Sequence, residues 1–194
     1  MARPNRSAER QQDAISTLAA TFAELGYRRT TTAVLAKRCG LTEVALYRLW
    51  PDKQAMFVAA IEFVGQHTER VWDEVAAGKA GGSAAERILG HEGKHLGEYG
   101  FHRILFAGFS ETDEPAIRDA LRTVYERLLR RIARHVGEHR GPDSQKGLPA
   151  AMATAWALLG LGTATNLGRE LGLLGDRARR ELFAAIGAHL LDGR

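Results

Sequence analysis

The stretch Thr30–Lys53, with the sequence TTTAVLAKRCGLTEVALYRLWPDK, decides the fold that we predict for this 194-residue chain. It predicts two short helices joined by a tight turn, followed by the start of another helix. Gly40 marks the turn, because glycine tolerates the positive φ that a tight turn needs. Threonine accepts hydrogen bonds from free amides at a helix start, so one residue of Thr30–Thr32 and then Thr42 are expected to cap the two helices. This pattern is typical of a helix-turn-helix, which places its second helix in a DNA major groove.

Helical periodicity continues on both sides of this stretch. Apolar residues recur at three- and four-residue steps from Ala14 to Leu25, which predicts an amphipathic helix that ends at Gly26. A further helix is expected from Lys53 to about Ala77, capped by Asp52. Between them, Leu46 and Trp50 are expected to point inward from the second helix of the motif.

The rest of the chain also has helical periodicity and lacks strand-like alternation. Five more helices are predicted, at residues 84–98, 101–109, 114–138, 148–171 and 177–191. The predicted class is therefore all-α, with about nine helices. We expect an N-terminal three-helix helix-turn-helix domain over residues 1–53 and a larger helical ligand-binding and dimerisation domain over residues 54–194.

Positive charge is concentrated at the start of the chain. Residues 1–53 hold nine basic and five acidic residues, which accounts for the whole formal net charge of +4. The other 141 residues hold 18 basic and 18 acidic residues. A positive N-terminal region on a neutral remainder is typical of a protein that binds a polyanion through that region.

Cysteine content and hydropathy indicate the cellular setting. Cys39 is the single cysteine, which excludes an internal disulfide framework. The chain shows no leader peptide pattern, and no apolar run reaches the roughly 18 residues that a membrane span needs. We therefore expect a soluble cytoplasmic protein without a membrane partner.

Residues on either side of the second helix, and one threonine before it, are predicted to contact DNA phosphates. Tyr47 and Lys53 flank the second helix of the motif, where a hydroxyl and an ammonium group can hold the phosphate backbone without reading bases. Thr31 or Thr32, at a helix start, can add a phosphate contact beside exposed amides.

Base reading is predicted for the exposed start of the same helix, from Thr42 onward. Arg48 can bond to guanine or to a phosphate, and Glu43 can accept a hydrogen bond from a cytosine amino group. Val44 or Ala45 can meet a thymine methyl group.

The region resembles the N-terminal domain of TetR-family transcriptional regulators over about residues 10–57. The matching positions are G-Y-x-x-T-T at Gly26–Thr31, L-A at Leu35–Ala36, G-L-T at Gly40–Thr42, L-Y at Leu46–Tyr47, an aromatic residue at Trp50, and Lys53. Trp50 stands where the family usually has phenylalanine. The resemblance implies the DNA contacts given above, a ligand pocket between the fourth helix and the helices that follow, and dimerisation through the last two helices.

Aromatic and histidine side chains gather in the middle of the chain. Such side chains can line an apolar ligand pocket with a few polar groups, although a closed core is their more frequent role. The residues predicted for the pocket are Phe63, His67, Trp72, His95, His102, Phe106, Tyr125 and Trp156.

The last two helices suit a two-fold four-helix interface, with a monomeric core as the alternative. Small residues that allow close helix approach recur in the first of them, and apolar residues recur in the second. These are Ala153, Ala157, Gly160, Thr163 and Ala164, followed by Leu182, Phe183, Ile186, Leu190 and Leu191.

One motif suggests different chemistry. His91-Glu92-Gly93-Lys94-His95 is a literal H-E-x-x-H, the pattern that puts two zinc ligands on one helix face with a glutamate base between them. Gly93 weakens the helix that must hold both histidines, and Lys94 adds a positive charge beside the supposed cation. We therefore predict no metal, no cofactor and no enzyme activity, and keep a zinc-dependent hydrolase or a metal-responsive protein as the alternative.

Together these patterns predict a homodimeric, sequence-specific DNA-binding regulator. Its expected partners are a palindromic double-stranded operator and an unidentified small molecule. Ligand binding is expected to favour a dimer geometry in which the spacing between the two recognition helices no longer fits the operator. A repressor would then leave its operator.

Overall fold

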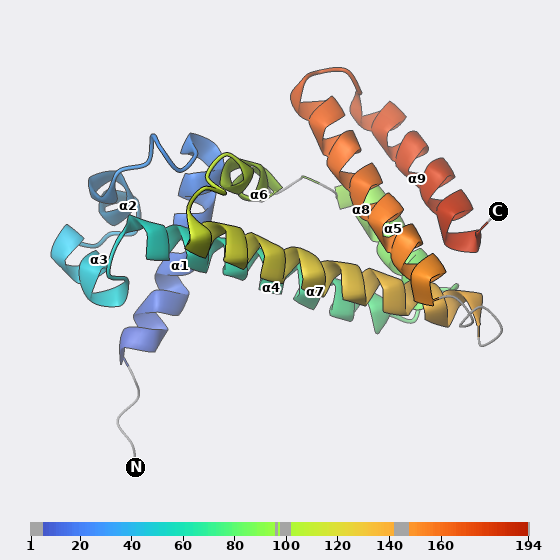
Figure 1. The fold of residues 1–194 in the computed structure, drawn as a ribbon, viewed down its shortest axis with the longest axis horizontal. Helices are drawn as coiled ribbons and strands as arrows, with labels where there is room; N and C mark the ends of the chain where they lie inside the picture. The colour runs from blue at the N-terminus through green and yellow to red at the C-terminus, as the bar shows by residue number, and fades with distance from the viewer. Residues whose placement is uncertain (1–5, 96, 98–101, 142–147, 194) are drawn as a thin grey trace, which may run out of the picture. The chain divides into compact units, whose positions relative to one another are not determined.

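The computed structural model describes residues 6–95, 97, 102–141 and 148–193, and the fold within these ranges is all-α, as predicted (Figure 1). Most predicted helix ends lie within two residues of the observed ones. The predicted end of the helix at residue 98 and the predicted start at residue 101 fall outside the described residues. The helices are α1 (Arg6–Leu25), α2 (Thr32–Arg38), α3 (Glu43–Leu49), α4 (Lys53–Ala76), α5 (Ala84–His95), α6 (His102–Phe109), α7 (Pro115–Arg140), α8 (Leu148–Glu170) and α9 (Asp176–Asp192).

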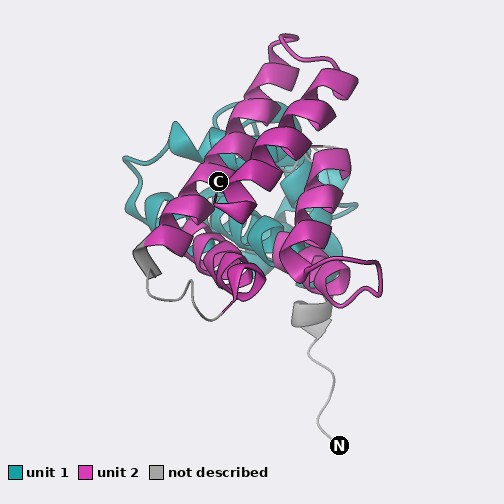
Figure 2. Ribbon diagram, turned by 90° about the vertical axis from the view of Figure 1, so that its right-hand side faces the viewer, with its two compact units in different colours: residues 1–67, 100–124 teal, residues 68–99, 125–194 magenta. Residues whose placement is uncertain are grey.

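The helices form two compact units, shown in teal and magenta in Figure 2. The first unit combines residues 1–67 with residues 100–124, and the second combines residues 68–99 with residues 125–194. The division between them falls inside α4 and inside α7. The first compact unit therefore contains the helix-turn-helix together with most of α4, α6 and the start of α7. The functional boundary that the sequence predicts after residue 53 stays a prediction.

Local hydrogen bonds set the ends of the short helices in the first unit. The Thr31 hydroxyl accepts from the Val34 amide at 3.3 Å, and the Thr42 hydroxyl accepts from the Ala45 amide at 3.2 Å. Gly40 has φ +65°, in the left-handed region that favours glycine, so the tight turn between α2 and α3 is confirmed.

Packing against α1 and against each other stabilises these two short helices, since helices of this length are marginal alone. Leu35 of α2 and Leu46 of α3 are completely buried, as is Phe22 of α1. Trp50 is 7 % exposed, so the inward positions predicted for α3 are confirmed.

Phe57 of α4 is expected to be the most sensitive core position of the first unit. Its ring is fully buried and lies 4.9 Å from the Phe22 ring and 4.8 Å from the Tyr27 ring, centroid to centroid. Phe57→Ala should lower the free energy of unfolding by about 3–5 kcal/mol, because it removes apolar contacts and leaves a cavity. Denaturant unfolding measures the loss. The half-exposed Phe109 of α6 serves as a control, and an equal loss in Phe109→Ala would contradict the assignment of the core.

The second unit is closed by side chains at the end of α7. The Arg140 guanidinium donates to the carbonyl oxygens of Leu190 and Leu191 at 2.7 and 2.9 Å, in the last turn of α9, where carbonyls lack partners within the helix. His139 bridges the Ser83 hydroxyl at 2.8 Å and the Asp192 carboxylate at 3.3 Å. The C-terminal end of α9 is thus tied to α7 and to the residue that caps α5. No described helix combines the length and the apolarity that crossing a membrane requires.

Candidate nucleic-acid interface

The outer face of α3 carries side chains that the sequence predicted for DNA contact, both to bases and, for Tyr47, to phosphate. Val44 is 64 % exposed and Tyr47 is 46 % exposed. Glu43 and Arg48 are also exposed, and Ala45 is partly exposed. Because Leu46 and Trp50 anchor the opposite face in the core, α3 presents a rigid surface rather than a loop.

Contacts with α1 fix the orientation of this surface. The Gln11 side-chain amide donates to the Leu49 carbonyl oxygen at 2.6 Å, which satisfies a free carbonyl at the end of α3. The Cys39 sulfur lies 3.8 Å from the Ala14 carbonyl oxygen, and burial raises the pKa of its thiol. Cys39 is therefore a packing residue of α2 and α1. The sequence carried no signal for the Gln11 contact, which joins residues 38 positions apart.

Three predicted DNA-contact residues form one hydrogen-bonded chain. The Tyr47 hydroxyl donates to the Thr32 hydroxyl oxygen at 3.3 Å, and the Thr32 hydroxyl donates to the Glu43 carboxylate at 2.6 Å. Thr32 is the first residue of α2, whereas Glu43 and Tyr47 belong to α3. The chain therefore orients the Glu43 carboxylate and the Tyr47 ring with respect to each other.

Lys53, the predicted phosphate contact at the start of α4, is held by Tyr27. The Lys53 ammonium donates to the Tyr27 carbonyl oxygen at 3.2 Å and lies 4.3 Å from the centroid of the Tyr27 ring. Partial burial, followed by the nearby carboxylates of Glu114, Asp52 and Glu111, raises the pKa of Tyr27. An ammonium has three donors, so the Tyr27 bond positions Lys53 and leaves donors for a phosphate.

The turn between α6 and α7 supplies two carboxylates to the first unit. The Arg28 guanidinium donates to both oxygens of the buried Glu111 carboxylate at 2.9 and 3.1 Å. The Gln54 amide of α4 donates to Glu114 at 2.8 Å. Hydrogen bonding to Glu111 is the main cause that raises the pKa of Arg28.

These carboxylates change the distribution of charge that the sequence suggested. The first unit holds 12 basic and 10 acidic residues, and the second holds 15 basic and 13 acidic, so each has a net charge of +2. Arg28 is paired with Glu111 and Arg38 with Glu24. Net charge therefore does not distinguish the two compact units, and the interface assignment depends on where individual exposed cations lie, Arg48 above all.

The eight side chains predicted to line a ligand pocket divide between the units. Phe63, His67, His102 and Phe106 belong to the first unit, and Trp72, His95, Tyr125 and Trp156 belong to the second.

Three members of the second group differ sharply in environment. Trp156 is 60 % exposed on α8. Trp72 is 7 % exposed and donates its indole N–H to Glu92 at 2.6 Å. Burial raises the pKa of Tyr125 to about 12. Trp72 is thus bound in a structural contact, and Trp156 lies on the surface.

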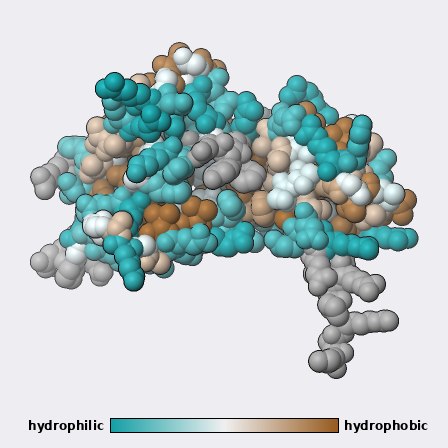
Figure 3. Space-filling model, turned by 180° about the vertical axis from the view of Figure 1, so that it is seen from behind, coloured by the Kyte–Doolittle hydropathy of each residue, from teal (hydrophilic) through white to brown (hydrophobic). Residues whose placement is uncertain are grey.

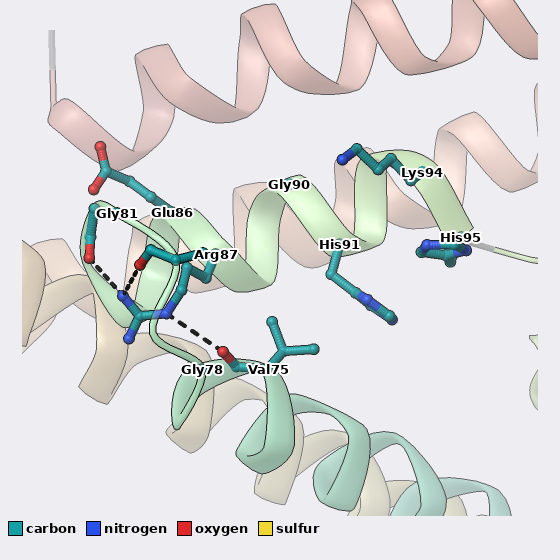
Figure 4. Close-up of a pocket in the computed structure, with 11 residues that line it drawn as sticks. Val75, Gly78, Gly81, Glu86, Arg87, Gly90, His91, Lys94 and His95 are labelled. Atoms are coloured by element: carbon teal, nitrogen blue, oxygen red, sulfur yellow. Dashed lines mark hydrogen bonds between the residues drawn. The ribbon is translucent and has the colours of Figure 1, made fainter.

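The second unit contains a cavity of about 470 Å³ between the end of α4, the following loop and one face of α5 (Figure 4). Of the predicted pocket residues, His95 lines it. Its other lining residues are Val75, Gly78, Ala80, Gly81, Gly82, Glu86, Arg87, Gly90, His91 and Lys94.

The H-E-x-x-H motif lies on α5, but its glutamate is bound elsewhere. The Glu92 carboxylate accepts the Trp72 indole hydrogen bond, and burial raises its pKa. Among the residues that the structure describes, no group of three or more histidine, cysteine, aspartate or glutamate side chains is placed to hold one metal ion. A catalytic zinc site uses three protein ligands and an open position, and in this structure the glutamate expected as its general base is hydrogen-bonded to Trp72.

Comparisons with known proteins agree on the fold and on the DNA-binding region. The family model described as "Bacterial regulatory proteins, tetR family" matches residues 14–60. The nucleoid occlusion factor SlmA of Vibrio cholerae is 37 % identical over 75 residues, which cover 36 % of this chain and 38 % of the factor. The SlmA of a Marinomonas species is 29 % identical over 163 residues, or 78 % of this chain and 76 % of the factor.

A solved TetR-family transcriptional regulator from Cytophaga hutchinsonii superposes with a TM-score of 0.75 at 16 % identity. The match covers 99 % of this chain and 98 % of that regulator. At this identity the likeness shows a shared fold, which includes the helical region beyond residue 60.

Proposed function

Since the chain belongs to the tetR family of bacterial regulatory proteins and carries its DNA-binding domain, we propose that it is a homodimeric transcriptional repressor. A small molecule releases it from a palindromic operator. The observation that carries this proposal is the exposed outer face of α3, anchored by the fully buried Leu46. Such a helix is the reading element of a helix-turn-helix.

We assign phosphate contacts to the residues around α3 and base contacts to its first two turns. Tyr47, Lys53, Thr31 and Thr32 hold the backbone, since hydroxyl and ammonium groups at these places fix register without sequence information. Thr42, Glu43, Val44, Ala45 and Arg48 face the bases, with Glu43 accepting from cytosine and Arg48 donating to guanine or to a phosphate.

The exposed apolar surface of α8 and α9 supports the proposed dimer. On the face shown in Figure 3, hydrophobic surface gathers in separate brown patches among hydrophilic surface. Exposed apolar side chains that gather on one surface of a protein mark interaction sites. The large exposed apolar residues of α8, α9 and the turn between them are Trp156, Leu167, Leu171, Leu173, Leu182 and Ile186.

Small residues complete this surface on α8. Ala153, Ala157, Gly160 and Ala164 are exposed and follow the same helical period as Trp156 and Leu167. Small residues allow close approach of a second copy's helices in a four-helix interface. Phe183 and Leu191, which sequence assigned to this interface, are 4 % and 2 % exposed, so they belong instead to the core of the second unit.

Release requires that the ligand bind the two dimer geometries with different affinity. α4 is one continuous helix from Lys53, beside the reader, to Ala76 in the second unit. Arg28 and Gln54 connect the reader to Glu111 and Glu114. We propose these connections as the path by which ligand binding changes the spacing between the two copies of α3.

Two experiments test this function. Selection from random double-stranded DNA should enrich a palindrome whose half-sites lie about one helical turn apart. Titration of that complex with a broad panel of small molecules should then identify compounds that weaken binding. Failure to enrich any sequence would overturn the regulator, whereas enrichment without any active compound would overturn only the ligand release.

Thr32→Val tests the hydrogen-bonded chain on α2 and α3. The change removes the hydroxyl that holds Glu43 and Tyr47. Discrimination at the base pair read by Glu43 should fall by about 1 kcal/mol, the typical net contribution of one such hydrogen bond. Competition binding with single-base operator variants measures it. Thr123→Val on α7, which loses a hydroxyl bonded to the Asp119 carbonyl, is the matched control. If Thr32→Val discriminates between the operator variants as well as the control does, the Thr32 hydroxyl does not position Glu43.

The similarity to nucleoid occlusion factors supports a second candidate function, binding to many chromosomal sites rather than to a few promoters. The 163-residue match to the Marinomonas factor extends well beyond the helix-turn-helix. Mapping the bound sites in cells decides between the two. A few sites next to promoters support the repressor, and many sites spread over the chromosome support the second candidate.

A further inference from the structure

His91 and His95 lie one helical turn apart on the same face of α5. Their ring centroids are 4.7 Å apart and their planes are inclined by 37°. Both line the cavity of the second unit, where Figure 4 shows them at the same end of the hollow. His95 is exposed and His91 is partly exposed, so the pair is accessible from solution.

We propose that His91 and His95 chelate one late first-row transition-metal ion, namely Cu²⁺, Ni²⁺ or Zn²⁺. Imidazole nitrogen suits these ions. With metal–nitrogen distances of about 2.0–2.1 Å, two imidazoles bound at right or tetrahedral angles have ring centroids roughly 4.5–5.2 Å apart. The observed separation lies within this range, so α5 already holds the rings at chelating distance.

The rest of the motif does not oppose this site. The Lys94 side chain leaves α5 in a different direction from the His91 side chain, although both residues line the cavity (Figure 4). Gly93 is buried in the interior of α5, where a β-carbon would lie 3.5 Å from the Phe183 ring. The glycine therefore lies in an intact helix that packs against α9, and α5 continues to His95.

Neighbouring charged groups are bound in other contacts. The Arg87 guanidinium donates to the carbonyl oxygens of Val75, Ala76, Ala80 and Gly82, which close the α4–α5 loop. Glu92 is bound by Trp72 and supplies no general base. The proposed site takes two protein ligands from the described residues, His91 and His95, and so differs from the three-ligand site of a zinc hydrolase.

Metal titration of the untagged full-length chain tests the proposal. Isothermal titration with CuCl₂ and with NiCl₂ should give one saturable site per chain, with Cu²⁺ bound more tightly than Ni²⁺ and Mn²⁺ more weakly than both. His91→Gln and His95→Gln should each weaken binding by about tenfold or more, since losing even an outer partner of a metal ligand costs about that much. His189→Gln, which removes an exposed histidine of α9, is the matched control and should leave binding unchanged.

Electron paramagnetic resonance of the Cu²⁺ complex gives an independent readout, and its wild-type spectrum tests the number of bound nitrogens without any variant. The wild-type spectrum should show two equatorial nitrogens, and each glutamine variant should show one. Absence of a one-per-chain site, or a wild-type site with the same affinity and nitrogen count in both glutamine variants, would overturn the proposal. The result is independent of whether the chain represses transcription, because DNA is absent from every measurement.

Discussion

Trp156→Glu combined with Ile186→Glu is expected to convert the protein to a monomer. Both side chains are exposed, at 60 % and 40 %, on the surface that we assign to the dimer. In a closed two-fold interface each substitution occurs twice, so four carboxylates would lose water without any counter-charge. Burying unpaired charge costs several kcal/mol per group, which exceeds the gain from the remaining apolar contacts.

Loss of the dimer has a large consequence for DNA binding. Two linked readers bind a two-site operator more tightly than either reader alone by about 100- to 10,000-fold, and the double variant should lose this factor. Its affinity for a single half-site should be unchanged, because the α3 surface is intact. Sedimentation equilibrium measures the mass, and fluorescence anisotropy with full and half operators measures the two affinities.

Phe109→Glu is the control for this prediction. Phe109 is 48 % exposed on α6, outside the proposed interface, so the variant introduces the same charge at a similarly exposed aromatic position. It should remain a dimer. A double variant that also remains a dimer would show that α8 and α9 do not form the interface.

Substitutions around α3 should have the second large effect. Tyr47→Ala and Lys53→Ala are expected to weaken binding to every DNA sequence and to reduce the slope of affinity against salt, by about one for the lysine. The reason is that a phosphate contact releases counterions but reads no base. Arg48→Ala should either behave in the same way or relax specificity at one base pair by about 1–3 kcal/mol, according to whether it meets a phosphate or guanine.

The structure requires a careful control for Lys53. Its ammonium also bonds to the Tyr27 carbonyl oxygen, so alanine removes a local contact together with the charge. Lys53→Arg keeps the charge and should retain most of the salt slope. Lys79→Ala, in the exposed α4–α5 loop, removes an equal charge from the second unit and should leave binding unchanged. Unaltered affinity in all three variants, Tyr47→Ala, Lys53→Ala and Arg48→Ala, would refute the assignment of α3 as the reading helix.

The sequence by itself determined the features that depend on residues a few positions apart. Helical period and capping act between residue i and residues up to i+4, so Thr42, Gly40 and Leu46 predicted a cap, a turn and an anchor that the structure confirms. The all-α class and the helix-turn-helix followed from the same short-range patterns, together with the resemblance of residues 10–57 to a family.

Tertiary structure alone decided which distant side chains meet. Arg28 pairs with Glu111 across 83 positions, and packing alone brings Glu92 to Trp72. Packing also decided that Phe183 faces the core of its own chain while Ile186 remains exposed, a distinction that the apolar period of α9 does not contain. The physical reason is that local patterns determine where a helix starts, where it ends and which side is apolar, whereas the partner of each side chain depends on how whole helices pack.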